Sequence, residues 1–158
     1  MYTNPILTEA IKKLERFCAY QERCHQEVLE KLYSFRFTEE EKDHVVVHLL
    51  EHDFLNEERF ARSFARGKHR IKGWGTNRIV MELKLRGITK FNIDTALSEI
   101  TEAEYHETFE RLSEKQWQLI SEKNQLKKRK KFCDFLLRKG FESDLIYARA
   151  KELEQNSF

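Results

Sequence analysis

Leu83–Ile88, which reads LKLRGI, decides the fold because similar segments stand on either side of it. Leu32–Phe37 reads LYSFRF and Leu136–Phe141 reads LLRKGF, so the three segments begin 51 and 53 residues apart. In each one, a basic residue or a glycine precedes a large apolar residue, which is typical of a helix end followed by a new helix. The spacing therefore predicts three tandem units of about 50 residues.

Apolar residues recur at helical spacing along the chain, as at Ile11, Leu14 and Phe17. Such positions share one face of a helix. Thr38–Glu41 and Thr101–Glu104 each have the sequence of a capping box, in which the hydroxyl and the carboxylate three residues later satisfy free N–H groups at a helix start. No stretch shows sustained alternation with a period of two residues. We therefore predict an all-α protein of nine short helices.

Dividing nine helices among three units gives repeats with the bounds 1–54, 55–100 and 101–158. A three-helix unit of about 50 residues has a thin core, and stacking against a neighbour buries what one unit leaves exposed. The expected fold is an elongated array of three tandem three-helix repeats. Such a shape suits a protein that lies along a partner.

The composition excludes several classes of protein. The chain has 158 residues and no run of about 18 apolar residues, so we expect no membrane span. The first fifteen residues lack a continuous apolar stretch, so we expect no secretory signal. Cys18, Cys24 and Cys133 match no zinc or redox spacing. We expect three reduced thiols in a cytoplasmic protein.

Candidate catalytic and metal sites are weak. His44, His48 and His52 follow one another at steps of four, so two of them could chelate a divalent metal from one helix face. No carboxylate or cysteine pattern completes such a site, and a solvated or partly buried histidine stripe is the simpler interpretation. The sequence contains no phosphate-binding glycine loop of the Walker type. We predict no enzymatic activity, no metal and no cofactor.

The net charge of +2 conceals alternating blocks of charge. Residues 1–58 and 91–122 each carry a net charge of −6, whereas residues 59–90 carry +9 and residues 123–141 carry +7. Two basic blocks in an otherwise acidic chain indicate polarised surfaces that face a polyanion or a partner with acidic patches.

The middle unit carries a recognisable motif. Phe54–Arg62 (FLNEERFAR), Gly73–Ile79 (GWGTNRI) and Glu82–Ile88 (ELKLRGI) resemble the middle repeat of the RecX family of bacterial recombination regulators. That repeat reads approximately Tyr-Leu-Asp-Asp-x-Arg-Phe-Ala, then Gly-Pro-x-Arg-Ile-x-x-Glu-Leu-x-x-Lys-Gly-Ile. Weaker similarity extends to Arg23–Val28 in the first unit and Phe135–Phe141 in the third. Among the departures, Thr76 replaces a helix-starting proline and Cys24 replaces an N-cap serine, which alters local helix starts.

The resemblance implies a cytoplasmic, non-enzymatic modulator of the recombinase RecA. Members of the family lie in the groove of the RecA filament on single-stranded DNA and bridge its protomers. They restrain ATP hydrolysis, strand exchange and repressor cleavage, and so modulate DNA recombination, DNA repair and the SOS response. We expect a monomer that binds the filament. The alternative is a single-stranded nucleic-acid-binding protein that competes with RecA for DNA.

The basic blocks supply the candidate contact residues. Arg59, Arg62 and Arg66 share one helix face, which could contact phosphates or carboxylates or could simply be solvated. Trp74 stands between two glycines and could be a stacking platform for a base or a lid over its own core. The candidate partner- or DNA-binding residues are Arg59, Arg62, Arg66, Lys68, Arg70, Lys72, Trp74, Arg78, Lys84, Arg86, Lys127, Lys128, Lys130 and Lys131.

Other motif residues have structural interpretations. Phe60 and Ala61 are predicted to be core residues because of their helical spacing with nearby apolar side chains. Gly87 is predicted to end a helix with a left-handed backbone. Glu82 is predicted to form an ion pair with Arg78, four residues before it.

Overall fold

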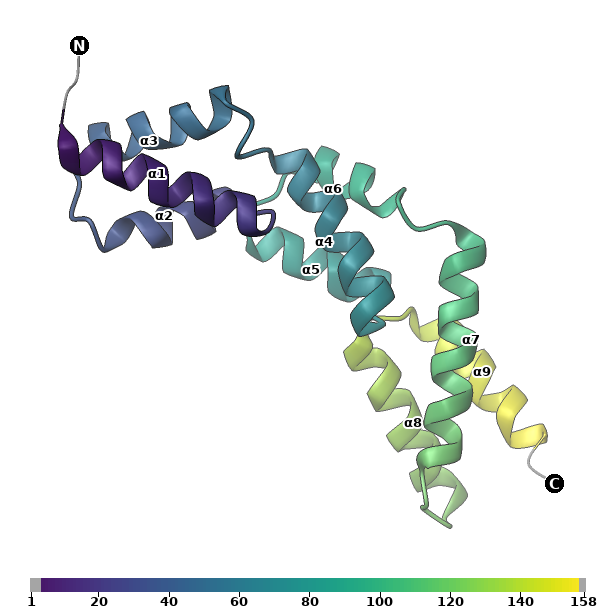
Figure 1. Ribbon diagram of the computed structural model, residues 1–158. Helices are drawn as coiled ribbons and strands as arrows, with labels where there is room; N and C mark the ends of the chain where they lie inside the picture. The colour runs from purple at the N-terminus through teal and green to yellow at the C-terminus, as the bar shows by residue number, and fades with distance from the viewer. Residues whose placement is uncertain (1–3, 157–158) are drawn as a thin grey trace.

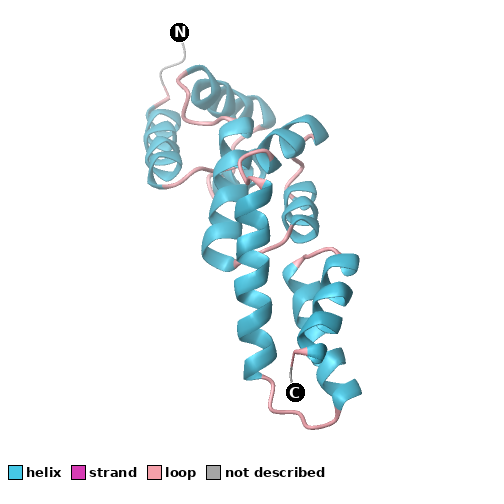
Figure 2. Cartoon of the chain, turned by 90° about the vertical axis from the view of Figure 1, so that its right-hand side faces the viewer, coloured by secondary structure: helices cyan, strands magenta, loops and turns pink. Residues whose placement is uncertain are grey.

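The computed structural model describes residues 4–156 and contains nine helices and no strand within that range (Figures 1 and 2). The predicted all-α fold is therefore confirmed. The outer limits of the predicted repeats, residues 1 and 158, lie outside the described residues. The helices are α1 (Pro5–Tyr20), α2 (His25–Tyr33), α3 (Glu39–Glu51), α4 (Glu57–Lys72), α5 (Thr76–Leu85), α6 (Lys90–Leu97), α7 (Glu102–Leu119), α8 (Gln125–Lys139) and α9 (Ser143–Gln155).

The helices form an elongated array of three-helix groups, with α1–α3 at one end and α7–α9 at the other (Figure 1). Each group has its own hydrophobic core. Leu14 and Leu49 are fully buried in the first core, Leu83 in the second, and Phe132 and Ile146 in the third. The predicted helical-repeat architecture is confirmed, because three small cores replace one large one.

Helix ends follow the local signals in the sequence. The Thr38 hydroxyl accepts from the Glu41 N–H at 3.2 Å, and the Glu41 carboxylate accepts from the Thr38 N–H at 2.9 Å, so the predicted capping box opens α3. The Thr101 hydroxyl also caps α7, but the Glu104 carboxylate bonds to a distant arginine instead of closing the box. Gly87 follows α5 with φ of +75°, a left-handed conformation that glycine adopts without strain, as predicted.

The first and second repeats meet at a small junction. Arg59 of α4 donates from Nε to the Glu22 carboxylate at 2.7 Å and from Nη2 to the Asp53 carbonyl oxygen at 2.9 Å. The Cys24 side chain at the start of α2 is 1% exposed and packs into the core of the second repeat. A side-chain ion pair and a buried thiol therefore both link the first repeat to the second.

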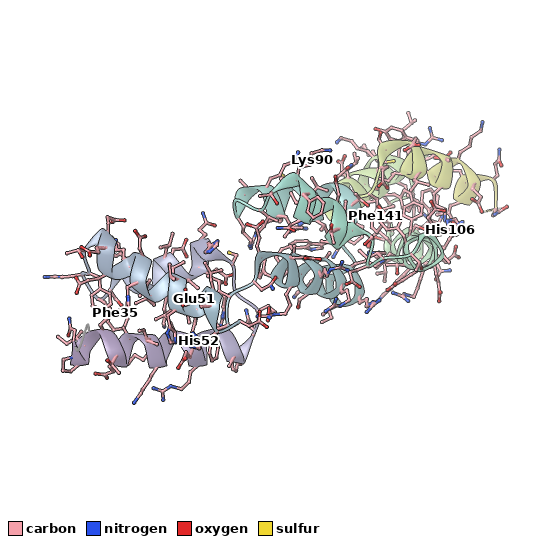
Figure 3. All side chains as sticks on the ribbon, turned by 90° about the horizontal axis from the view of Figure 1, so that it is seen from above. Phe35, Glu51, His52, Lys90, His106 and Phe141 are labelled. Atoms are coloured by element: carbon pink, nitrogen blue, oxygen red, sulfur yellow. The ribbon has the colours of Figure 1, made fainter. Side chains whose placement is uncertain are left out.

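The second and third repeats are joined through their backbones. The Gly75 N–H donates to the Lys139 carbonyl oxygen at 2.7 Å, and the Asn77 N–H donates to the Gly140 carbonyl oxygen at 2.9 Å. The free N–H groups at the start of α5 thus satisfy carbonyls at the end of α8, which is a favourable end-to-end alignment of helix dipoles. Phe141 is fully buried where these repeats meet (Figure 3).

The thiols are buried inside this framework. Cys18, Cys24 and Cys133 are all free cysteines. Burial raises the pKa of the Cys18 thiol to about 11, so it stays protonated at neutral pH. Within residues 4–156, no helix is both long and apolar enough to cross a bilayer.

Candidate partner interface

Two arginines of the predicted contact face on α4, Arg62 and Arg66, are paired with carboxylates from the same repeat. Arg62 donates to the Glu99 carboxylate at 2.9 Å and pairs with Glu58 at 3.1 Å, and Arg66 pairs with the same Glu99 at 3.1 Å. Hydrogen bonding to Glu99 raises the pKa of Arg62, and the pKa of Glu99 is lowered for the same reason. This part of the predicted contact face is therefore already occupied by internal ion pairs.

Further candidate arginines are also paired. Arg70 donates to the Glu104 carboxylate at 2.6 Å, which links α4 to α7. Arg86 donates to the Glu82 carboxylate at 2.8 Å. The predicted pair between Glu82 and Arg78 is therefore wrong. Glu82 pairs with Arg86, four residues after it. Arg78 instead lies over the Trp74 ring and donates to the Arg138 carbonyl oxygen at the end of α8.

Five cations at the junction of the second and third repeats lack such compensation. None of them lies within 4.0 Å of a carboxylate oxygen in the described part of the chain. They come from the end of α4, the first turn of α5 and the end of α8. We call this group the junction cluster, and its members are Lys68, Lys72, Arg78, Arg138 and Lys139.

Backbone carbonyls at helix ends hold two members of the cluster in place. Arg78 donates from Nη1 to the Arg138 carbonyl oxygen at 3.2 Å, and Lys139 donates from Nζ to the Lys72 carbonyl oxygen at 3.0 Å. Each bond crosses from one repeat to the other. Burial lowers the pKa of Lys139, and the nearby Arg78 and Lys72 charges lower it further. The charges of Lys72, Arg78 and Lys139 are therefore gathered at this site, and no carboxylate oxygen of residues 4–156 lies within 4.0 Å of them.

The Trp74 ring lies beneath two cations of the junction cluster. The Arg78 guanidinium carbon lies 4.1 Å from the centre of the Trp74 ring, and Lys68 Nζ lies 5.1 Å from it. The Trp74 and Phe64 rings form a T-shaped pair with their centres 6.1 Å apart, and Trp74 packs against the core of the second repeat. The Trp74 carbonyl oxygen lies 2.9 Å from Nδ1 of the buried His69, which fixes the segment between α4 and α5. Trp74 was predicted either to stack on a base or to cover the core of its own repeat, and this geometry favours the covering role.

The candidate lysines of the second basic block lie elsewhere on α8. Lys128 lies over the Trp117 ring at 4.2 Å, Lys130 pairs with Asp134 at 2.8 Å, and Lys127 and Lys131 are exposed. Lys127 to Lys131 lie eight to twelve residues before the end of α8, a distance of about 12 to 18 Å along the helix. These lysines therefore do not join the junction cluster, and neither does the exposed Lys84 near the end of α5.

Sequence reasoning left out two members of the cluster, Arg138 and Lys139. Both lie in the repeat-ending segment Leu136–Phe141 and in the second basic block, so their charge was visible in the sequence. Their position beside Lys72 and Arg78 was not visible, because 60 or more residues separate the bonded partners.

The predicted core residues are buried, with Phe60 5% exposed and Ala61 fully inaccessible. In the histidine stripe, His48 Nε2 lies 3.1 Å from the Glu15 carboxylate, and the His48 and His52 rings stack with centres 4.1 Å apart. Among residues 4–156, no three His, Cys, Asp or Glu side chains gather in a way that could hold a metal ion.

The fold is that of a tandem helical-repeat protein, and its sequence assigns it to a known group. A family model described as the second three-helix domain of RecX matches residues 56–97, and one described as the third three-helix domain matches residues 102–148. The chain therefore belongs to the RecX family.

Curated relatives carry the name regulatory protein RecX. The chain is 28% identical over 142 residues to the protein from Leuconostoc mesenteroides, covering 90% of this chain and 53% of that one. It is 26% identical to the protein from Clostridium perfringens strain 13, covering 86% and 64%. Identity to the Thermotoga maritima protein is 30%, covering 83% and 76%. The chain thus spans less than two thirds of the length of the first two relatives.

Solved structures of the family share the fold. The crystal structure of RecX from Lactobacillus salivarius matches with a TM-score of 0.78 and 26% identity, covering 95% of this chain and 97% of that one. A second crystal structure, described as regulatory protein RecX, matches with a TM-score of 0.81 and 22% identity, covering 93% and 73%.

Proposed function

We propose that this protein binds the RecA filament on single-stranded DNA and inhibits its recombinase, ATPase and co-protease activities. Membership in the RecX family, whose curated members are named regulatory proteins, is the observation that carries this proposal. The role is non-enzymatic, since any effect on ATP turnover is exerted on the active sites of the filament. The protein acts as a cytoplasmic monomer that modulates DNA recombination, DNA repair and the SOS response.

Two structural features support this role. The elongated array offers a long surface for the number of residues in the chain (Figure 1). The junction cluster provides uncompensated positive charge near the middle of that array. This charge is complementary to the negative charge of a filament that contains nucleic acid. The internally paired arginines of α4 contribute less, because a partner would first have to break their ion pairs.

The test is single-strand-dependent ATP hydrolysis by RecA of the host, titrated with this protein below stoichiometric ratios. A parallel anisotropy titration measures binding to the bare strand. Inhibition at well under one molecule per RecA, with weak binding to bare DNA, is the expected result. Inhibition that begins only when the strand is saturated would replace filament regulation with competition for DNA.

That competition is the second candidate function. The junction cluster favours it, because five cations without carboxylate partners can contact phosphates directly. It predicts an affinity for bare single strands that falls by orders of magnitude between about 50 and 200 mM salt if about six phosphates are contacted.

A further inference from the structure

A cleft with a volume of about 690 Å³ lies where the second repeat meets the third. Its walls come from the end of α6, the linker to α7, the first turns of α7 and the start of α9 (Figure 1). The lining runs from the buried Phe109 to the exposed Ala103, so the cleft opens to solvent. Its other apolar lining residues are Leu97, Ile100 and Leu145. The volume and the mixture of apolar and polar walls are typical of a binding site.

The polar part of the lining carries negative charge. Glu102 and Glu142 line the cleft, and its described lining residues include no lysine or arginine. Glu142 accepts a hydrogen bond from the neutral Tyr105 hydroxyl, and neither carboxylate forms an ion pair within residues 4–156. Arg70, on the neighbouring α4, is bound to Glu104 instead. The cleft therefore combines apolar walls with carboxylates that have no cation beside them.

Hydrogen bonds hold the Glu142 carboxylate in place. The Thr76 N–H donates to the Tyr105 hydroxyl at 3.1 Å, and this hydroxyl donates to Oε2 of Glu142 at 2.7 Å. The Tyr105 ring stacks on the buried His69, with the ring centres 5.4 Å apart. Because a hydroxyl has one proton to donate, Oε1 of Glu142 is left to accept from a ligand.

These charges decide which class of ligand fits. A nucleic-acid strand would bring phosphates next to Glu102 and Glu142, and like charges repel. His106 (Figure 3), which also lines the cleft, does not offset this repulsion, because its Nε2 lies 3.6 Å from the Glu110 carboxylate. A purely apolar segment would bury Glu142 without a cation, which is costly. A lysine or arginine avoids both penalties, because its stem can lie along apolar walls while its cationic head meets the carboxylate.

We propose that the cleft binds a protein segment in which an arginine or lysine is flanked by apolar residues. The basic head group bonds to Oε1 of Glu142, and the flanking residues pack on the apolar walls, which are formed by Leu97, Ile100 and Leu145. A protein segment fits better than a free small cation, because the volume exceeds that of one side chain and the walls are apolar. This inference goes beyond the proposed function, since it assigns a protein-binding site whose charge is opposite to that of the junction cluster.

The first test measures binding of acetyl-Leu-Arg-Leu-amide to the isotope-labelled full chain by NMR. Amide shifts should change around Glu102 and Glu142, with a dissociation constant of about 1 mM. The analogue with citrulline in place of arginine has nearly the same shape without the charge and should bind about ten-fold more weakly. The inference would be overturned by the absence of shifts up to about 10 mM peptide, by shifts confined to other parts of the chain, or by equal binding of the two peptides.

The second test examines the apolar walls. Acetyl-Gly-Arg-Gly-amide keeps the cation but lacks the flanking side chains, so it should bind about ten-fold more weakly than the Leu-Arg-Leu peptide. Equal binding by these two peptides would show that the flanking residues make no contact, which would contradict a site for a protein segment.

The third test locates the site with charge variants. Glu142→Gln keeps an acceptor for the Tyr105 hydroxyl but removes the negative charge, so the Leu-Arg-Leu peptide should bind about ten-fold more weakly. The citrulline peptide should bind this variant and the parent within about two-fold of each other. Glu107→Gln is the matched control, because it removes one charge from the exposed surface of α7 outside the cleft. Equal losses in the two variants would show that net charge, and not the cleft, attracts the peptide.

Melting temperatures show whether each variant is folded. Glu102→Gln provides a second measure if Glu142→Gln is unstable, because Glu102 is exposed. It should weaken binding of the Leu-Arg-Leu peptide by about three-fold, since solvent screens an exposed charge. Unchanged binding by both glutamine variants of the lining would overturn the inference. None of these tests contains RecA or DNA, so their failure would leave the proposed function standing, and failure of the RecA assay would leave the cleft site standing.

Discussion

The Gly75 N–H donates to the Lys139 carbonyl oxygen at 2.7 Å, which joins the second and third repeats through backbone atoms. A methyl group on Gly75 would lie 2.5 Å from the Gly140 carbonyl, so the approach requires glycine at this position. The same contact brings Arg78 and Lys139 into one cluster. The close approach of the backbones at Gly75 and Gly140 therefore contributes both to the junction and to the composition of the candidate site.

Gly75→Ala should lower the free energy of unfolding by at least about 2 kcal/mol, because the added methyl group meets backbone that cannot rotate away. Gly67→Ala is the matched control. A methyl group there meets nothing within 4 Å and lies inside α4, so stability should rise by up to about 1 kcal/mol. Urea denaturation followed by circular dichroism measures both changes. If Gly75→Ala and the parent protein have the same free energy of unfolding, the close backbone contact between the repeats does not contribute to stability.

Tyr105 should make the protein sensitive to alkaline pH. Burial raises the pKa of its hydroxyl to about 12, and that hydroxyl accepts from the Thr76 N–H and donates to Glu142. Because the folded state holds this proton more tightly than the unfolded state, its stabilising effect is present below pH 10 and is lost as the pH rises towards 12. Tyr105→Phe should be less stable than the parent at pH 8, by about 1 kcal/mol, and this difference should shrink above pH 10.

Unfolding free energies of the parent and of Tyr105→Phe, measured between pH 8 and 11.5, check this prediction. Comparing the two proteins at each pH removes the contribution of the lysines, which titrate in both. A difference that stays constant across this range would contradict the assigned pKa direction.

The pair between Arg59 and Glu22 should couple the first two repeats weakly. Its side chains are 38% and 25% exposed, so solvent screens the attraction. A double-mutant cycle with Arg59→Gln and Glu22→Gln should give a coupling energy of about 0.5–1 kcal/mol at low salt. The coupling should fall at about 1 M salt, where charges are screened over about 3 Å. Coupling that is independent of salt would indicate a packing contact in place of an ion pair.

Arg149 should be important for the third repeat. The side chain is 8% exposed and donates to the Ser113 hydroxyl at 3.0 Å, while it pairs with Glu110, Glu114 and Glu152. Arg149→Met removes the central cation from three carboxylates and should cost about 3 kcal/mol. Arg111→Met, on the exposed surface of α7, should change stability by less than about 0.5 kcal/mol. Denaturation curves of the two variants provide the comparison, and equal stability would contradict the role of Arg149.

Local features of this protein could be predicted because their causes lie within one or two helical turns. The Thr38 capping box, the left-handed Gly87 and the burial of Phe60 depend on neighbours in the sequence. The regular spacing of helix endings in turn defined the repeats. The capping role of Glu104 failed as a prediction, because Arg70, 34 residues before it, competes for the same carboxylate.

The pairing of charges was beyond sequence reasoning for a similar reason. Arg59, Arg62 and Arg66 lie on one helix, α4, as predicted, but their partners Glu22 and Glu99 lie up to 37 residues away. A basic block in the sequence therefore says how much positive charge is present. It does not say how much of that charge is left for a partner.

The sequence by itself determined the helices, their ends and their grouping into three repeats, because hydrophobic period and capping act over a few residues. Only the tertiary structure decided which cations stay uncompensated, because ion pairing depends on distance in space and not on spacing in the chain. Lys72 and Lys139 are 67 residues apart, yet one donates to the carbonyl of the other across the repeat junction. That fold-dependent proximity brings a few cations from each of the two basic blocks into one candidate site.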